Sequence, residues 1–339
     1  MLARKSIYTL LTVLLLSNVM AFLVANSSDK IKVRNDISSY KSFYNCLEYD
    51  INSIHKCNTL IGTQNDILFQ SFSYVGKNIL KFNFKFFLYV LVFSIFFSIL
   101  FTVYKSSVYP SVSILFLLSD YRFWEYGANT LRAGIAIAIM LISFYLYLQK
   151  QNILTSLFKF LPSFAHITAF FYILVPFNHI KSKKLILLFL LAIIFSYNFH
   201  IIFELSKILP NTLFDKIYFY YNQNLINKVP FGIPMQYLAI ILFGFYLYIT
   251  NQVKDKIFIF SFNIIIIALL LFISLIPLGM SYRYSYYMLP FLAIVLSFEV
   301  DYIMNICKFK SYKGMVVSIS YLAILFILWH DLKVILLKI

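Results

Sequence analysis

Charged residues are scarce in this 339-residue sequence, and acidic residues are the scarcest of them. Charged side chains make up 12% of the chain, against roughly 25% in soluble proteins, while 61% of the residues are hydrophobic. A chain with so little polar surface would not stay in water, so the composition excludes a soluble domain. The long apolar runs predict an all-α fold, a polytopic integral membrane helical bundle with about 10 transmembrane helices.

Several catalytic and binding signatures are also missing. Three cysteines are too few for a disulfide scaffold or a zinc cluster. The sequence has no HExxH helix, phosphate-binding loop, nucleophile elbow or CxxC pair, which leaves ATP-driven transport and zinc proteolysis unsupported and predicts chemistry without a cofactor or metal. The net charge of +16 comes from basic residues that flank apolar runs and anchor helices, so nucleic acid is not an expected partner.

The polar segments predict how the chain is organised. We expect a single transmembrane domain over residues 1–339, beginning with an uncleaved anchor at Ile7–Ala25. Residues 26–82 and 204–233 are the two sizeable polar segments, and we predict that both are periplasmic loops. Cys46 and Cys57 share the first loop, where an oxidising compartment would permit a disulfide. Two unpaired thiols are the alternative, and the sequence leaves both open.

The short basic loops predict the topology, because Lys and Arg in such loops face the cytoplasm. All of these loops fall on one side only if residues 153–177 form a broken or re-entrant segment rather than one ordinary span. Pro162, near the middle of that segment, favours a break. The same count places three arginines at membrane mouths on the outer face: Arg122, Arg132 and Arg283.

These three arginines are the candidate anion-binding residues. The planar guanidinium donates two parallel hydrogen bonds and keeps its charge, so Arg132, Arg283 and Arg122 could clamp a diphosphate. Arg132 is the strongest candidate, because Gly134 lets a neighbouring helix approach closely beside it. The structural alternative is that an arginine at a helix end only reaches toward lipid headgroups.

The candidate catalytic residues are His166, Asp120 and Glu125. An imidazole in an apolar setting beside a predicted break is a candidate base or substrate ligand, and the two acids could activate or bind a sugar hydroxyl. The alternative for the acids is that they pair with Arg122. The sequence does not decide which of the three is the base.

The segments that carry these residues resemble those of the EpsG/Wzy-like family of bacterial polysaccharide polymerases. The likeness lies in NTLRAGIAIAIMLISFYLYL, FLPSFAHITAFFYILVPF and YRYSYYMLPFLAI, and upstream in DISSYKSFYN and DILFQSFSYVGKNI. Asp66 opens the last of these segments, where the family often has an acid followed by proline. Ala133 follows Arg132, where the family commonly has glutamine.

This resemblance implies an enzyme of the bacterial inner membrane. It would transfer an undecaprenyl-diphosphate-linked glycan onto the next lipid-linked repeat unit at the periplasmic face, as in O-antigen polymerisation. Its partners would be that lipid-linked oligosaccharide, membrane lipid and, as a further candidate, a chain-length regulator. The alternatives are a flippase or transporter of lipid-linked oligosaccharide, an O-antigen ligase and a membrane acyltransferase. The absence of a visible internal repeat argues against the transporter.

Overall fold

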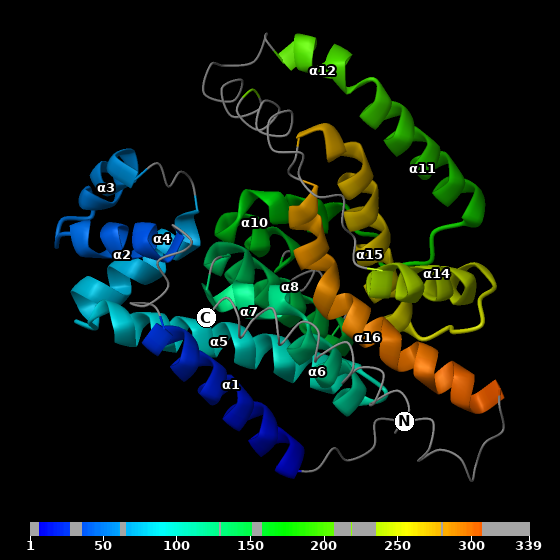
Figure 1. Cartoon of the computed structure of the whole chain (residues 1–339), viewed down its shortest axis with the longest axis horizontal. Coiled ribbons are helices and arrows are strands. Elements are labelled where there is room, and N and C mark those ends of the chain that lie inside the picture. The colour runs from blue at the N-terminus through cyan, green and yellow to red at the C-terminus, as the bar shows by residue number, and fades with distance from the viewer. Residues whose placement is uncertain are drawn as a thin grey trace. The chain divides into compact units, whose positions relative to one another are not determined.

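The computed structural model describes residues 7–27, 36–61, 66–128, 130–150, 158–206, 218, 235–278 and 281–306. These residues form helices and connecting turns and contain no strand, which confirms the all-α prediction (Figure 1). They divide into two compact units, one ending at Ile173 and one beginning at Leu174. The single transmembrane domain predicted for residues 1–339 stays a prediction.

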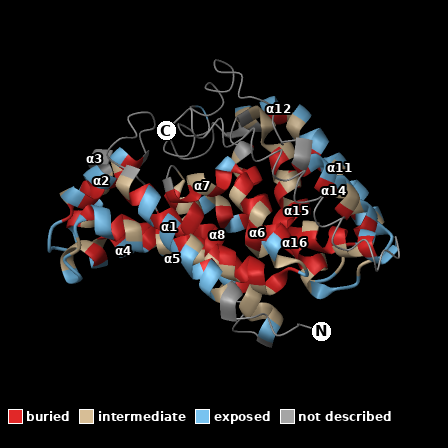
Figure 2. Ribbon diagram, turned by 60° about the horizontal axis from the view of Figure 1, so that its bottom comes forward, coloured by how far each residue is buried: buried red, intermediate tan, exposed pale blue. Residues whose placement is uncertain are grey.

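Helix length and composition make this a membrane protein. Within the described ranges, four helices are long and apolar enough to cross a membrane: α5 (Phe84–Ser106), α8 (Leu131–Lys150), α15 (Lys256–Ser274) and α16 (Tyr282–Ile306). Shorter apolar helices include α1 (Ile7–Ser27), α6 (Pro110–Ser119) and α14 (Met235–Ile249). Large apolar side chains are exposed along α1 and along α11 (Ser182–Tyr197), where lipid rather than water is the compatible surrounding (Figure 2).

The first unit is built on α5. Helix α1 packs along one side of α5, α8 packs along another, and α7 (Tyr121–Ala128) contacts both α5 and α8. Asn83 caps the start of α5, because its side-chain oxygen accepts a hydrogen bond of 2.8 Å from the Phe86 N–H. Thirteen of the 23 residues of α5 are buried against its neighbours, so α5 supports the shorter elements around it.

The predicted first loop is largely helical. It contains α2 (Asp36–Cys46), α3 (Ser53–Ile61) and α4 (Ile67–Tyr74), and α4 continues into a π-helical turn at Val75–Ile79. Helix α2 packs against α3 and α5. A segment predicted as a polar loop is therefore a small helical layer attached to the membrane helices.

The segment between α8 and the second unit is broken, as the topology argument predicts. Its described part consists of a 3₁₀ turn (Phe158–Phe160), the short helix α10 (Leu161–Ala165) and a 3₁₀-helix (Ile167–Leu174). Pro162 lies at the start of α10, where its missing N–H costs no intrahelical hydrogen bond. Helix α10 packs against both α8 and α4. The broken segment therefore contacts the small helical layer that contains α4.

The second unit contains α11, α12 (Phe199–Ser206), α14, α15 and α16. Helix α15 packs against α16, α11 and α14, and α14 also packs against α16. The Asn263 amide of α15 donates to the carbonyls of Pro176 (2.8 Å) and Asn178 (2.9 Å), which ties the preceding connection to this helix. The second predicted periplasmic loop, 204–233, lies almost entirely outside the described residues.

Candidate functional site

Arg132, at the start of α8, is the centre of a polar cluster in the first unit. Its Nη1 forms an ion pair with the Asp66 carboxylate, and its Nε donates a hydrogen bond of 3.3 Å to the Tyr40 hydroxyl. The guanidinium carbon lies 5.7 Å from the centre of the Tyr40 ring, within range of a cation–π interaction. Three segments far apart in the sequence therefore meet at one arginine.

This cluster is mostly buried, and Arg132 is its partly exposed member. The Arg132 side chain is 26% exposed to solvent, whereas the Asp66 side chain is 8% exposed. A guanidinium has five N–H donors, and the two contacts with Asp66 and Tyr40 use two of them. Within the described part of the chain, the remaining donors are available to an anion that reaches the exposed side of Arg132.

Tyr40 and Asp66 are held in place by packing between α2 and α4. Tyr40 is 2% exposed, and its ring lies 4.9 Å from the ring of Phe69 on α4. The ring of Phe43, about one helical turn later, also packs near Phe69, with 6.1 Å between the ring centres. Asp66 directly precedes α4, so the aromatic packing that fixes α4 also fixes the carboxylate.

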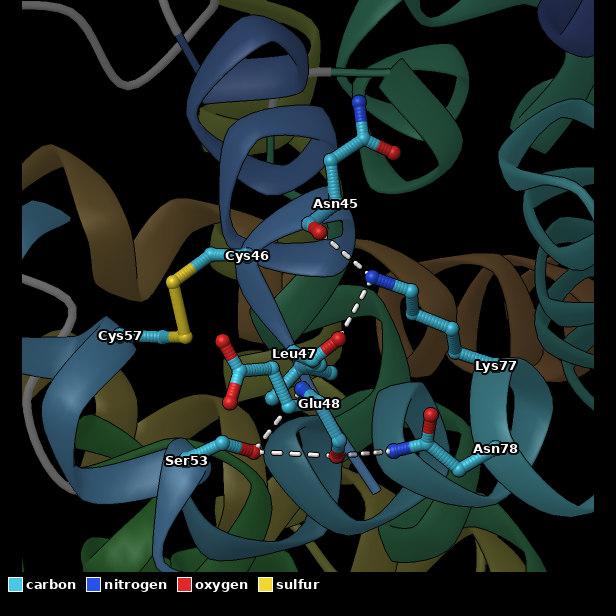
Figure 3. Close-up of a disulfide and its surroundings, with 8 residues drawn as sticks. All are labelled: Asn45, Cys46, Leu47, Glu48, Ser53, Cys57, Lys77 and Asn78. Carbon is cyan, nitrogen blue, oxygen red and sulfur yellow. Dashed lines mark hydrogen bonds between the residues drawn. A yellow bond between two sulfur atoms is a disulfide. The ribbon is translucent and has the colours of Figure 1, made fainter. Parts of the chain in front are cut away.

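A disulfide joins Cys46, at the end of α2, to Cys57 on α3, which decides between the two alternatives that the sequence leaves open (Figure 3). Near the disulfide, the Lys77 ammonium donates a hydrogen bond to the Asn45 carbonyl and another, of 2.6 Å, to the Leu47 carbonyl. Asn78 donates to the Glu48 carbonyl at 2.7 Å. These cross-links connect the end of α2 to the helical turn that follows α4 (Figure 3).

A tyrosine anchors the same layer to α5. The Tyr44 hydroxyl donates a hydrogen bond of 2.8 Å to the Phe82 carbonyl, and its ring stacks on Phe87 at 4.7 Å. Burial raises the pKa of Tyr44 to about 12, so the phenol stays protonated and remains a donor at physiological pH. The helical layer that supplies Tyr40 and Asp66 is thus attached to the membrane helices on which Arg132 lies.

Gly134 allows α7 and α8 to approach as closely as the sequence predicts. A Cβ atom at this position would lie 2.5 Å from the Tyr126 carbonyl oxygen, which is backbone and cannot move aside. At the turn between these helices, the Glu125 carbonyl accepts hydrogen bonds from the Thr130 N–H (2.8 Å) and hydroxyl (3.0 Å). The close approach and this turn together fix the point where α8 begins, one residue before Arg132.

We expect Gly134→Ala to destabilise the protein by about 1–3 kcal/mol, because the added methyl group must push α7 away from α8. Thermal unfolding of the purified protein in detergent measures this loss. Gly127→Ala is the matched comparison on α7: its Cβ would meet the side chains of Val92 (2.8 Å) and Phe96 (3.1 Å) rather than backbone, so we expect a smaller loss. Equal losses for both variants would contradict the backbone explanation.

Asp120 and Arg122 contact one another, which is the alternative that the sequence analysis leaves open. The Asp120 carboxylate accepts a hydrogen bond of 2.9 Å from the Arg122 backbone N–H and lies 3.6 Å from the Arg122 guanidinium. Asp120 is 1% exposed and precedes α7, so it caps that helix. Their predicted roles, in catalysis and in diphosphate binding, stay predictions, as does the role of the half-buried Glu125.

His166 ends α10, close to the elements that carry the cluster. Its Nδ1 accepts a hydrogen bond of 3.2 Å from the Thr168 backbone N–H and lies 2.6 Å from the Thr168 hydroxyl. A backbone N–H can only donate, so the neutral imidazole has its proton on Nε2. The predicted role of His166, as base or substrate ligand, stays a prediction.

Arg283 belongs to the second unit, where it lies in the first turn of α16 next to the buried Tyr284. Its predicted part in a diphosphate clamp stays a prediction. Sequence reasoning did not assign a role to Tyr40 or Asp66, although both lie in the segments that carry the family resemblance. In the described ranges, no group of three or more His, Cys, Asp or Glu side chains is arranged to hold a metal ion.

Comparison with known proteins identifies one family. The sequence model of the EpsG family matches residues 13–336, which is nearly the whole chain. No curated protein matches the chain, and no solved structure matches it.

Proposed function

Because the chain belongs to the EpsG family, a family of Wzy-like polysaccharide polymerases, we propose that it polymerises a lipid-linked glycan at the membrane surface. The substrate that we propose is an undecaprenyl-diphosphate-linked oligosaccharide. The growing glycan is transferred onto the next lipid-linked repeat unit at the periplasmic face, as in O-antigen polymerisation. The reaction is a glycosyl transfer that needs no nucleotide, because the donor already carries its leaving group, and we propose that it is also metal-independent.

The observation that carries this proposal is the convergence of Tyr40, Asp66 and Arg132. In a glycosyl transfer, a hydroxyl of the acceptor sugar attacks the anomeric carbon of the donor. The bond from that carbon to the diphosphate oxygen breaks, and its electron pair leaves with the lipid diphosphate. Positive charge held in advance where this negative charge develops lowers the barrier. Arg132 is such a charge, because Asp66 and Tyr40 fix its orientation and one side remains exposed.

The attacking hydroxyl also loses a proton, which requires a base. Asp120 is nearly inaccessible and faces Arg122, and the Nδ1 of His166 accepts from Thr168. Glu125 is half-buried on α7 and remains the acid that we favour as the base. His166, as an Nε2–H donor, would bind a substrate oxygen instead.

The disulfide supports the periplasmic face. Disulfides persist in oxidising compartments and are rare in the cytosol. Cys46–Cys57 lies in the helical layer that supplies Tyr40 and Asp66, so this layer and the Arg132 end of α8 would face the periplasm.

Deletion of the gene tests the polymerase directly. We expect surface lipopolysaccharide to lose its ladder on a gel while a single capped repeat unit remains, and complementation with the full chain to restore the ladder. Loss of every repeat unit would contradict the proposal and indicate a flippase or a ligase instead.

The purified chain in liposomes provides the matching control. Given only the lipid-linked repeat unit, it should produce longer glycans and release polyprenyl diphosphate, at a rate unchanged by EDTA. A flippase would move the substrate between leaflets without lengthening it. An acyltransferase would leave the glycan length unchanged.

A further inference from the structure

The second unit contains an acid buried inside a helix that is long and apolar enough to span a membrane. Glu299 is 4% exposed and lies about two helical turns, roughly 10 Å, inside the end of α16. An acid at such a depth is costly, because hydrocarbon and apolar side chains do not solvate its charge. Glu299 has no part in the proposed glycosyl transfer, so its burial needs another explanation.

The carboxyl group fits into a space that a glycine leaves on the neighbouring helix. A Cβ atom on Gly244 of α14 would lie 3.0 Å from the Glu299 Oε1 and 2.6 Å from the ring of Phe262 on α15. The carboxyl is therefore enclosed at the junction of α14, α15 and α16, between backbone and an aromatic ring. Its Oε1 is inaccessible to solvent and has no hydrogen-bond partner within the described residues.

In the described α14, α15 and α16, the basic side chains are Lys256 and Arg283, each in the first turn of its helix. Among the described residues, the titratable groups on α14 are Tyr237, Tyr246 and Tyr248, and α15 has only Lys256, at its exposed first residue. On α16 itself, Arg283 lies in the first turn and Asp301 adds an acid rather than a cation. From α14, the Gly244 backbone comes closest to the carboxyl, since a Cβ atom there would lie 3.0 Å from Oε1.

We propose that Glu299 is a proton-binding site: a neutral carboxylic acid buried at the junction of α14, α15 and α16, and open to modification by an apolar carbodiimide. An isolated ionised carboxylate in apolar surroundings costs far more than a neutral carboxyl, so the group binds a proton. The neutral acid donates as well as accepts hydrogen bonds, which suits a position against the backbone of α14. Loss of the proton would put an unpaired charge between α14 and α16 and force them apart.

Carbodiimide chemistry tests this state, because apolar carbodiimides react with protonated carboxyls. The acid O–H adds across one C=N bond: the carboxyl oxygen bonds to the central carbon, and the proton passes to nitrogen. We would treat the full chain in lipid nanodiscs with dicyclohexylcarbodiimide at neutral pH and map the adduct by peptide mass spectrometry. We expect modification at Glu299 and its loss in Glu299→Gln.

Asp255 is the control acid within the same unit. It is exposed to solvent and caps α15, accepting a hydrogen bond of 2.7 Å from the Ile257 N–H, so it lacks the apolar surroundings of Glu299 and should not react. Equal modification of Asp255 and Glu299 would overturn the proposal. So would the absence of modification at Glu299 together with a wild-type infrared spectrum that has no protonated-carboxyl band.

Infrared spectroscopy gives a second measurement that does not depend on how the variant folds. Wild-type protein at neutral pH should show the C=O stretch of a protonated carboxyl, and carbodiimide treatment should remove that band. The band should also be missing from Glu299→Gln. A wild-type spectrum with no protonated-carboxyl band contradicts the proposal even if the carbodiimide fails to enter. None of these outcomes depends on the polymerase activity.

Discussion

Replacing Arg132 with alanine is expected to remove the polymer ladder and leave a single capped repeat unit on the cell surface. In the proposed reaction, Arg132 stabilises the negative charge that develops on the departing lipid diphosphate. Loss of one such donor commonly slows a reaction on the order of 100- to 1000-fold. We expect a loss of this size in the rate of glycan elongation by the purified protein in liposomes.

Two further variants separate charge from geometry. Arg132→Lys keeps a positive charge but loses the planar fork, so its rate should fall between those of wild type and Arg132→Ala. Arg122→Ala removes a neighbouring arginine whose guanidinium faces Asp120, and we expect a smaller loss. A full ladder from Arg132→Ala at normal expression would remove this residue from the site.

Much of the fold follows from local sequence physics. The apolar runs require helices in a membrane, Pro162 disfavours a continuous span, and Gly134 permits close helix packing; the structure shows each consequence. The helical layer at residues 36–79 does not follow in this way. Its helices are too short to be stable alone, and packing of Tyr40 and Phe43 against Phe69 holds α2 and α4 together.

The site shows a similar division. Arg132 is recognisable from its place at the mouth of a small-residue helix, but its partners are 66 and 92 residues away along the chain. Contacts at such separations depend on tertiary packing, which one sequence does not encode in any local pattern. Asp120 illustrates the opposite case: an acid directly before a short helix suits a cap, and the structure places it as one.

The ion pair between Arg132 and Asp66 makes a second strong prediction, on stability. Asp66→Ala leaves a largely buried guanidinium without its counter-charge. Breaking a fully buried pair typically costs roughly 3–5 kcal/mol. Because the Arg132 side chain is 26% exposed, water compensates part of the loss, and we expect about 1–3 kcal/mol. Reversible unfolding in mixed detergent and SDS micelles measures the free energy of each variant.

A double-mutant cycle isolates the pair itself. Once Arg132→Ala is present, Asp66→Ala should cost little more, so the two single losses should exceed the loss in the double variant by about 1–2 kcal/mol. Tyr40→Phe is the matched control for the cluster: it keeps the ring that packs on Phe69 and removes only a hydroxyl that accepts from Arg132. Its loss should be smaller, about 1 kcal/mol. Strictly additive losses for Asp66 and Arg132 would show that the ion pair does not stabilise the fold, and that Asp66 does not fix the orientation of the arginine.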